Sequence, residues 1–118
     1  MSSNIFKGKS GELYAREYLE NKGYAYITSN FKTRFGEIDL IFKDKKRIIF
    51  VEVKFRTSLL FGDPIESVTR SKLTKLKKAI YEFLGKNPQF QKLLPSIEVV
   101  GIFFENNNPK ITHIKDIV

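Results

Sequence analysis

Two acidic side chains and one lysine stand where the surrounding pattern calls for apolar residues. Residues 47–55 are typical of a strand, in which alternate side chains share a face, and Glu52 and Lys54 continue a face that begins as apolar. Asp39 is embedded in the apolar run 38–42. A carboxylate in such surroundings must be paired, protonated or bound to a cation. These three side chains are therefore the first candidates for chemistry.

The two acids belong to neighbouring strands of a predicted hairpin. Residues 37–43 and 47–55 are rich in aromatic and β-branched side chains, and the polar segment 44–46 is typical of a turn. In a hairpin the start of one strand lies opposite the end of the other, which places Asp39 near Glu52 at one end of the sheet. We therefore expect two carboxylates and one ammonium group to converge there.

Strict alternation along residues 37–43 assigns each side chain to a face of the sheet. One face is expected to carry Ile38, Leu40 and Phe42. The other face is expected to carry Glu37, Asp39 and Ile41. Gly36, which comes directly before this strand, permits a bend or a close approach of the backbone.

A third acid comes from the first predicted helix. Glu12 precedes Ala15 and Leu19 by three and seven residues, so it shares their core-facing stripe in the first turn. Gly8 and Gly11 flank it and would let the backbone approach another element closely. We therefore expect this carboxylate to join the other two.

Each acid also has an ordinary structural explanation. Glu12 suits the dipole of a helix start, and Asp39 could cap a bulge. Glu52 and Lys54 could form an ion pair at a sheet edge. Together, however, they offer oxygen ligands at one apolar-walled location, in a chain whose single His113 has no partner nearby and is interpreted as structural. Such a ligand set suits Mg²⁺ or Mn²⁺, with the lysine serving the attacking water or a phosphate-centred transition state.

The elements that must position these residues follow an α-β-β-β-α-β-β order. The expected helices span 9–22 and 67–86, and the expected strands span 24–29, 37–43, 47–55, 97–104 and 110–118. The segment 58–64 is typical of a loop. Because a helix separates the third and fourth strands, these two should be parallel through a crossover. The sequence predicts an α/β fold: one domain over 1–118, with a mixed sheet of about five strands flanked by helices.

Composition excludes several classes of protein. The 118 residues contain no Cys, which excludes disulfides, thiol catalysis and zinc ribbons. No apolar stretch approaches the ~20 residues that a membrane span needs, and the start of the chain lacks the apolar core of a signal peptide. We therefore expect a cytoplasmic protein with no membrane contact.

The net charge of +8 favours a polyanionic partner, expected to be nucleic acid and most simply DNA. The segment 68–95 is the most basic part of the chain, although a run of lysines is also typical of a solvated helix face. The cations expected to contact phosphates are Arg34, Arg56, Arg70, Lys72, Lys75 and Lys78.

The motifs resemble a known family. Residues 36–39 (GEID), followed after twelve residues by 52–54 (EVK), resemble the D…E-x-K core of the PD-(D/E)xK nuclease superfamily. The wider agreement over 8–12, 36–41 and 50–56, with Phe61 and Gly62, is similar to the YraN-type family of uncharacterised bacterial proteins. The resemblance covers residues 8 to about 102.

This resemblance implies a restriction-endonuclease-like core, similar to that of archaeal Holliday-junction resolvases. It implies that Asp39 and Glu52 bind a divalent metal, that Lys54 assists the attacking water and that Glu12 completes the surroundings of the metal. It also implies a homodimer. The family's arginine before the late strand is absent here, where Ser96 and Ile97 precede Glu98, so any phosphate or subunit contact of that arginine is in doubt.

Three functions compete on these observations. The first is a metal-dependent DNA endonuclease selective for branched DNA, in which Phe61 could wedge into a junction. The second is a non-catalytic nucleic-acid-binding module that keeps the nuclease fold. The third is an adaptor whose basic face meets an acidic protein, which leaves the converging acids without a purpose. The first explains both the acids and the charge.

Overall fold

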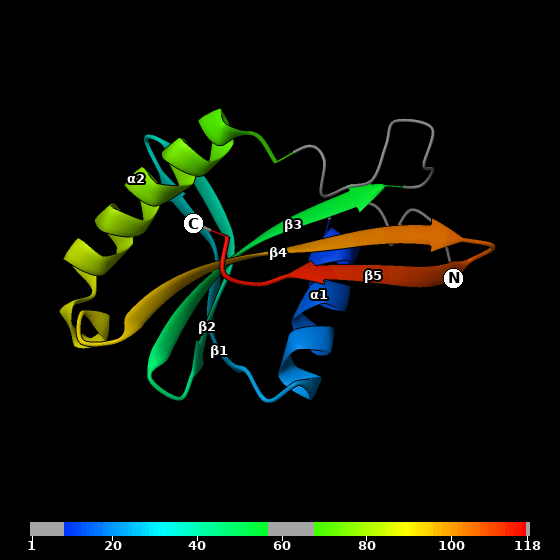
Figure 1. Ribbon diagram of the computed structural model, residues 1–118, viewed down its shortest axis with the longest axis horizontal. Helices are drawn as coiled ribbons and strands as arrows, with labels where there is room; N and C mark the ends of the chain where they lie inside the picture. Colours follow the sequence, from blue (N-terminus) through cyan, green and yellow to red (C-terminus); the bar gives the residue numbers. More distant parts are fainter. Residues whose placement is uncertain (1–8, 57–67, 118) are drawn as a thin grey trace.

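The computed structural model describes residues 9–56 and 68–117, in the predicted order of elements (Figure 1). The helices are α1 (Lys9–Asn21), α2 (Arg70–Lys86) and the short 3₁₀ turn η4 (Pro88–Phe90). The strands are β1 (Ala25–Thr33), β2 (Gly36–Asp44), β3 (Arg47–Arg56), β4 (Leu94–Glu105) and β5 (Asn108–Ile114). The predicted loop 58–64 with Phe61, and also Gly8, lie outside the described residues.

The strands form one mixed sheet in the order β1-β2-β3-β4-β5. β3 and β4 are parallel, and the other neighbouring pairs are antiparallel. The parallel pair is connected through α2, which confirms the predicted crossover. The predicted α/β class with a mixed sheet of about five strands is likewise confirmed, and it is consistent with a restriction-endonuclease-like core. No helix formed by the described residues is both long enough and apolar enough to cross a membrane.

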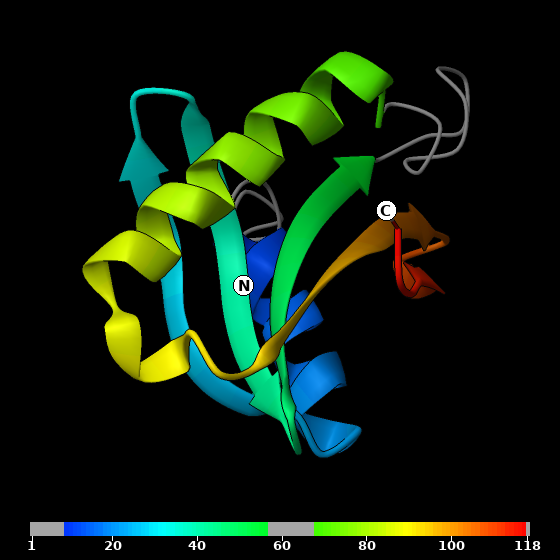
Figure 2. The ribbon, with the colours of Figure 1, turned by 60° about the vertical axis from the view of Figure 1, so that its left-hand side comes forward.

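The two long helices cover opposite faces of the sheet. Figure 2 shows α2 crossing in front of the strands and α1 behind them. The α1 side packs Ala15, Leu19, Tyr24, Leu40, Phe42, Ile49, Val51, Val100 and Ile102 into one cluster. The α2 side packs Ile38, Ile41, Ile48, Phe50, Leu76, Ala79, Ile80, Phe83 and Ile97 into another. β2 and β3 contribute to both clusters, which is why their sequences are almost continuously apolar.

The ends of the helices follow from local chemistry. Gly23 has a φ of +98°, a left-handed conformation that glycine adopts without strain, and its N–H bonds to the carbonyl oxygen of Glu20. α2 begins at Arg70, three residues later than predicted. Its start is set by Thr69, whose hydroxyl oxygen accepts a hydrogen bond from Lys72 N at 3.2 Å.

The expected alternation along β2 is wrong at its first residues. Leu40 and Phe42 share a face as predicted, which packs on the α1 side, but Ile38 packs with Ile41 on the α2 side. The change of face falls at Asp39, where the pairing register with β1 is not shifted. On β1, Asn30 lies between the pairing partners of Ile38 and Leu40 and has a φ of +53°. This local twist turns Ile38 to the other face and leaves the Asp39 side chain at the point of irregularity.

Candidate metal centre

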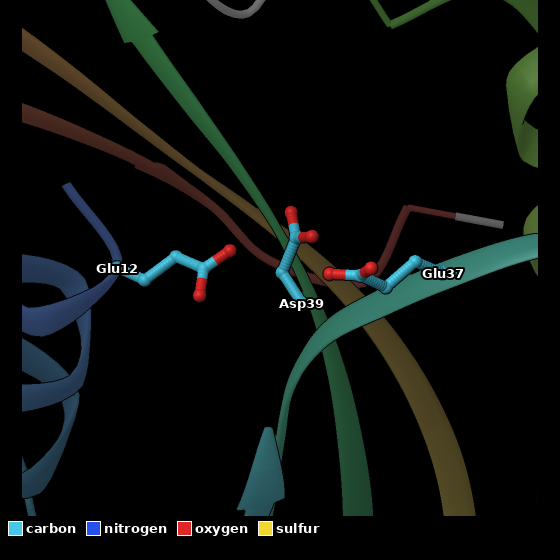
Figure 3. A group of neighbouring side chains, drawn as sticks. All are labelled: Glu12, Glu37 and Asp39. Carbon is cyan, nitrogen blue, oxygen red and sulfur yellow. The ribbon is translucent and has the colours of Figure 1, made fainter. Parts of the chain in front are cut away.

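Three carboxylates from two elements meet at the irregular end of β2. Glu12 of α1 and both Glu37 and Asp39 of β2 each offer one oxygen atom, and these atoms all lie within 4.8 Å of one another. Figure 3 shows Asp39 between the other two side chains, with Glu12 reaching in from α1. Glu12 and Asp39 were expected to meet. Glu37 was not expected in this group, although the two-residue spacing of Glu37 and Asp39 was a signal for it.

A glycine allows α1 to bring Glu12 to this point. A Cβ atom at Gly11 would lie 2.9 Å from Cδ2 of Phe55 on β3, closer than two such carbons can approach without a shift. Gly11 is buried, and its neighbour Glu12 is half-buried. The predicted close approach of the helix backbone is therefore found, and it is made against the strand that also carries Glu52 and Lys54.

An asparagine connects two of the acids. Asn30 Nδ2 donates to Glu12 Oε1 at 3.0 Å, with Oε2 at 3.2 Å, and it donates to Glu37 Oε1 at 2.7 Å. The positive φ of Asn30, which asparagine tolerates better than most residues, aims its side chain between them. Sequence reasoning missed this residue. The available signal was an asparagine inside a predicted sheet, where asparagine is depleted.

The Asp39 carboxyl group is held between the sheet and the other acids. Its Oδ2 atom accepts a hydrogen bond from the backbone N–H of Val53 at 2.8 Å, beyond the last backbone pair of β2 and β3 at Leu40 and Val51. Burial raises the pKa of Asp39 to about 8, helped by the charges of Glu52 and Glu12 and opposed by the Val53 hydrogen bond. At neutral pH the group therefore holds a proton in the absence of a cation.

Glu52 and Lys54 occupy the α2 side of the same strand end, on the face predicted for them. Lys54 Nζ lies 3.1 Å from Glu52 Oε2, and the two side chains are only 16% and 21% exposed. The Glu52 carboxylate is close enough to Asp39 to raise the pKa of that group. Glu52 stands outside the tight group of three carboxylates, in which Glu37 is found instead.

Three cations gather beside Glu52. The Lys72 ammonium lies against that of Lys54, with the Arg56 guanidinium also near, and these positive charges lower the pKa of Lys72. The Nε atom of Arg56 is buried and has no hydrogen-bond partner in the part of the chain that the structure describes. Positive side chains therefore lie beside the carboxylates at this end of the sheet.

The other cations that were predicted to contact phosphates lie on the β1–β2 turn and on α2. Arg34 and Lys78 lie over the Phe35 ring, at 5.1 and 5.5 Å from its centroid. Lys75 lines a cavity together with Lys72. Arg70, the first residue of α2, is exposed.

Open spaces reach the acids from both faces of the sheet. On the α2 side, a cavity of about 190 Å³ reaches Glu37 and Glu52 between the β1–β2 turn and α2. Its apolar walls are Phe35, Val68, Leu73, Leu76 and Ala79. On the α1 side, a hollow of about 220 Å³ is lined by Glu12 and Asn30. Both a cation and a larger ligand can therefore reach the carboxylates.

A second polar cluster is built around Glu98, which is fully buried on the α1 side of β4. Its carboxylate accepts a hydrogen bond from Tyr24 Oη at 2.9 Å and one from His113 Nε2 at 2.6 Å, and Arg47 Nη1 lies 3.6 Å away. Burial, followed by the hydrogen bond and charge of Glu98, raises the pKa of Tyr24 to about 12. We name Glu98, Tyr24, His113 and Arg47 the Glu98 cluster.

The Glu98 cluster shows that the expectation of an unpartnered His113 is wrong. It also shows which arginine lies beside Glu98. His113 is not alone, because the pairing of β5 with β4 brings its ring to Glu98, and Tyr18 Oη lies 3.4 Å from its Nδ1. The arginine that the family places before the late strand is absent, but Arg47 at the start of β3 brings a guanidinium to Glu98. This acid is therefore paired within the fold.

The chain is similar to proteins that carry only a family designation. The model of the uncharacterised protein family UPF0102 matches residues 11–102. A UPF0102 protein of Syntrophomonas wolfei is 45% identical over 107 residues, covering 91% of this chain and 92% of that protein. Another, of Carboxydothermus hydrogenoformans, is 35% identical over 111 residues, covering 94% and 93%. A third, of Caldicellulosiruptor bescii, is 44% identical over 111 residues, covering 92% and 93%.

Proposed function

The chain belongs to the uncharacterised protein family UPF0102, and from the geometry of its acidic site we propose that it is a divalent-metal-dependent DNA endonuclease. The membership confirms the YraN-type resemblance, but the family designation gives no activity. The observation that carries the proposal is the meeting of Glu12, Glu37 and Asp39 beside the Glu52–Lys54 pair. Acids so placed repel one another until a cation or a proton neutralises them.

The donor set fits a hard cation. All the candidate ligands are carboxylate oxygens, which suit Mg²⁺ or Mn²⁺ better than zinc. We propose that Asp39 and Glu52 hold the ion and that Glu12 completes its surroundings, with Glu37 as a further ligand that the structure adds to the set. The raised pKa of Asp39 supports this assignment, because a bound cation favours the charged carboxylate in place of the proton. When bound, such an ion polarises a phosphoryl oxygen and lowers the pKa of the attacking water.

Lys54 is the residue proposed to serve the water. Its ammonium is held by Glu52 at 3.1 Å, and the N–H of its neighbour Val53 donates to Asp39. In phosphodiester hydrolysis, a water oxygen bonds to phosphorus while one phosphorus–oxygen ester bond breaks. The water gives up a proton, and the departing alkoxide gains one. A fixed ammonium group beside the phosphate orients the water and stabilises the negative charge that develops on the phosphate oxygens.

The surrounding cations support a nucleic-acid substrate. Lys72 and Lys75 line the same cavity as Glu52, so a phosphate backbone that approaches the acids there meets two positive charges. A purely non-catalytic binding module would place carboxylates against phosphate for no gain. By the resemblance to resolvases, we further propose branched DNA as the substrate and a homodimer as the active form.

Cleavage assays with matched variants test the proposal. Purified protein is incubated with branched, flapped and linear DNA in Mg²⁺ or Mn²⁺, and products are resolved on denaturing gels. We expect cleavage that is lost in Asp39→Ala and Glu12→Gln and retained in Glu17→Gln, because Glu17 is exposed on the same helix away from the site. Equal cleavage by Asp39→Ala would overturn the assignment. Binding without cleavage would favour the non-catalytic module.

A further inference from the structure

The cavity on the α2 side has the lining of a binding pocket for a flat, partly apolar group. Its walls include the half-buried Phe35 ring and the side chains of Leu73, Leu76 and Ala79. The cavity opens between the β1–β2 turn and the first half of α2 and extends to Glu37 and Glu52. A metal ion alone needs none of these apolar walls. Water alone is held poorly by them, because a buried water needs polar partners.

The charged groups at this cavity are distributed unequally. Lys72 and Lys75 lie on its α2 wall, and the Lys54 ammonium lies against that of Lys72. Lys54 has an ion pair with Glu52, and the Glu37 and Glu52 carboxylates lie on the opposite, sheet side of the cavity. The cavity therefore combines apolar walls with two lysines on its α2 side that suit an anionic group.

We propose that this cavity receives one unpaired nucleotide of the substrate strand, with its base against Phe35 and its phosphate against Lys72 and Lys75. The proposal rests on the proposed nuclease function and adds a substrate class to it: nucleic acid with an unpaired segment at the cleavage site. A nucleotide joins an aromatic face to an anion, which is the combination that the cavity offers.

A continuous duplex has no exposed base that could fill this cavity. Its bases are stacked inside the helix, so only phosphates and groove edges reach the protein surface, and the apolar cavity would stay unfilled. A single strand, a flap or a frayed end exposes a base at little or no cost of unpairing. Phe35 is suited to hold it, because bases stack on aromatic side chains without regard to sequence. Arg34 and Lys78 lie over the Phe35 ring in the free protein, at 5.1 and 5.5 Å from its centroid. A stacked base takes the place of a cation on that ring face, and the displaced side chain then attracts a flanking phosphate.

The absence of tryptophan from the chain allows a direct test. Phe35→Trp places a single indole in the cavity wall, and Tyr81→Trp places one on α2 at a residue that is 79% exposed and does not line this cavity. Each full-length variant is titrated in EDTA with a 12-nucleotide single strand and with the blunt duplex of the same sequence. Fluorescence reports the stacking of a base, and anisotropy of a labelled oligonucleotide reports total binding.

We expect the single strand to quench Phe35→Trp and to leave Tyr81→Trp unchanged, while the duplex binds without quenching either. We also expect Phe35→Ala to weaken single-strand binding about tenfold and to leave duplex binding unchanged, as judged against Tyr81→Ala. Quenching of Phe35→Trp by the duplex, or binding of the single strand without quenching, would overturn the proposal.

These outcomes are separate from those of the cleavage assay. Because the titration is done without metal, quenching can occur in a protein that cleaves nothing, which would retain the pocket and reject the nuclease. Conversely, metal-dependent cleavage of blunt duplex at the same rate as flapped DNA would retain the nuclease and reject the pocket. Lys72→Ala, with Lys77→Ala as its control on the same helix, then tests the phosphate contact through single-strand affinity.

Discussion

The protein holds carboxylates in two regions, and their surroundings differ. In the Glu98 cluster, the carboxylate is fully buried and meets Tyr24, His113 and Arg47. At the candidate metal centre, Asp39 has one backbone hydrogen bond and otherwise faces other acids, which helps to raise its pKa to about 8.

The difference distinguishes a structural acid from a functional one. Donors and a positive charge satisfy Glu98 within the fold, so it needs nothing from outside. Asp39 and its neighbours cost stability as they stand, and a cation would relieve that cost. Natural folds keep such unfavourable groupings chiefly at sites that bind or react.

The largest effect is expected at Glu98. Glu98→Ala removes the charge that pairs with Arg47 and leaves Tyr24 and His113 without their acceptor, so the free energy of unfolding should fall by about 3 kcal/mol. Urea denaturation of the folded variant measures the loss, and Mg²⁺ or Mn²⁺ binding should be unchanged. A loss below about 1 kcal/mol, or a selective loss of metal binding, would contradict the division between the two regions.

The pH dependence of stability should reveal the unsatisfied acid. The folded protein holds a proton on Asp39 up to about pH 8, whereas the unfolded chain releases it near its ordinary pKa of 3.8. Between these values the unfolded state binds fewer protons, so the free energy of unfolding of the metal-free protein falls as pH rises and levels off above about pH 8.

Asp39→Asn is the control for this titration. The variant should lack the Asp39 contribution to the fall and should be more stable than the natural chain at pH 8 by about 1 kcal/mol or more. Thermal melts in EDTA from pH 5 to pH 9 measure the difference between the two curves. If the natural chain gained stability relative to the variant as pH rises, the raised pKa would be wrong.

A smaller effect is expected from the contact between α1 and β3. Gly11→Ala puts a methyl group against Phe55 and should destabilise the protein by about 1 kcal/mol while moving Glu12 away from Asp39. Gly85→Ala is the matched control, because no atom lies within 4 Å of the added methyl, and it should stabilise α2 by about 0.5 kcal/mol. Chemical denaturation compares the two helices, and effects of the same sign would argue against a specific approach at Gly11.

The smallest effect is expected at the asparagine that connects Glu12 and Glu37. Asn30→Gly keeps the positive φ without strain but removes the side-chain amide. Stability should change little, while Mn²⁺ affinity should fall by about tenfold or less because the two acids lose their common donor. Calorimetric titration measures the affinity. A gain in affinity would mean that the amide competes with the ion instead of positioning its ligands.

The order of the elements could be predicted because it depends on short-range patterns. Apolar runs, helical spacing and the Gly23 stop are visible in the sequence, and they located both helices and the parallel pair of strands. The same patterns identified two acids, Asp39 and Glu52, and one cation, Lys54, within otherwise apolar strands. Such misplaced charges are visible without any knowledge of tertiary contacts.

The details of the site depend on contacts that the pattern does not contain. The break in alternation at Ile38 arises where Asp39 bonds to Val53 and Asn30 adopts a positive φ on the neighbouring strand. Strict alternation along one strand cannot anticipate that break. Glu37 is different, because its two-residue spacing from Asp39 was visible in the sequence, although its place in the carboxylate group was not predicted.

The central claim is that the converging acids bind a divalent cation, and calorimetric titration with Mn²⁺ tests it most directly. We expect one ion bound per chain, with affinity reduced by about tenfold or more in Asp39→Asn and unchanged in Glu98→Gln, provided that both variants remain folded. Mn²⁺ binding of equal strength in the natural chain and in Asp39→Asn, or no binding to the natural chain, would contradict it.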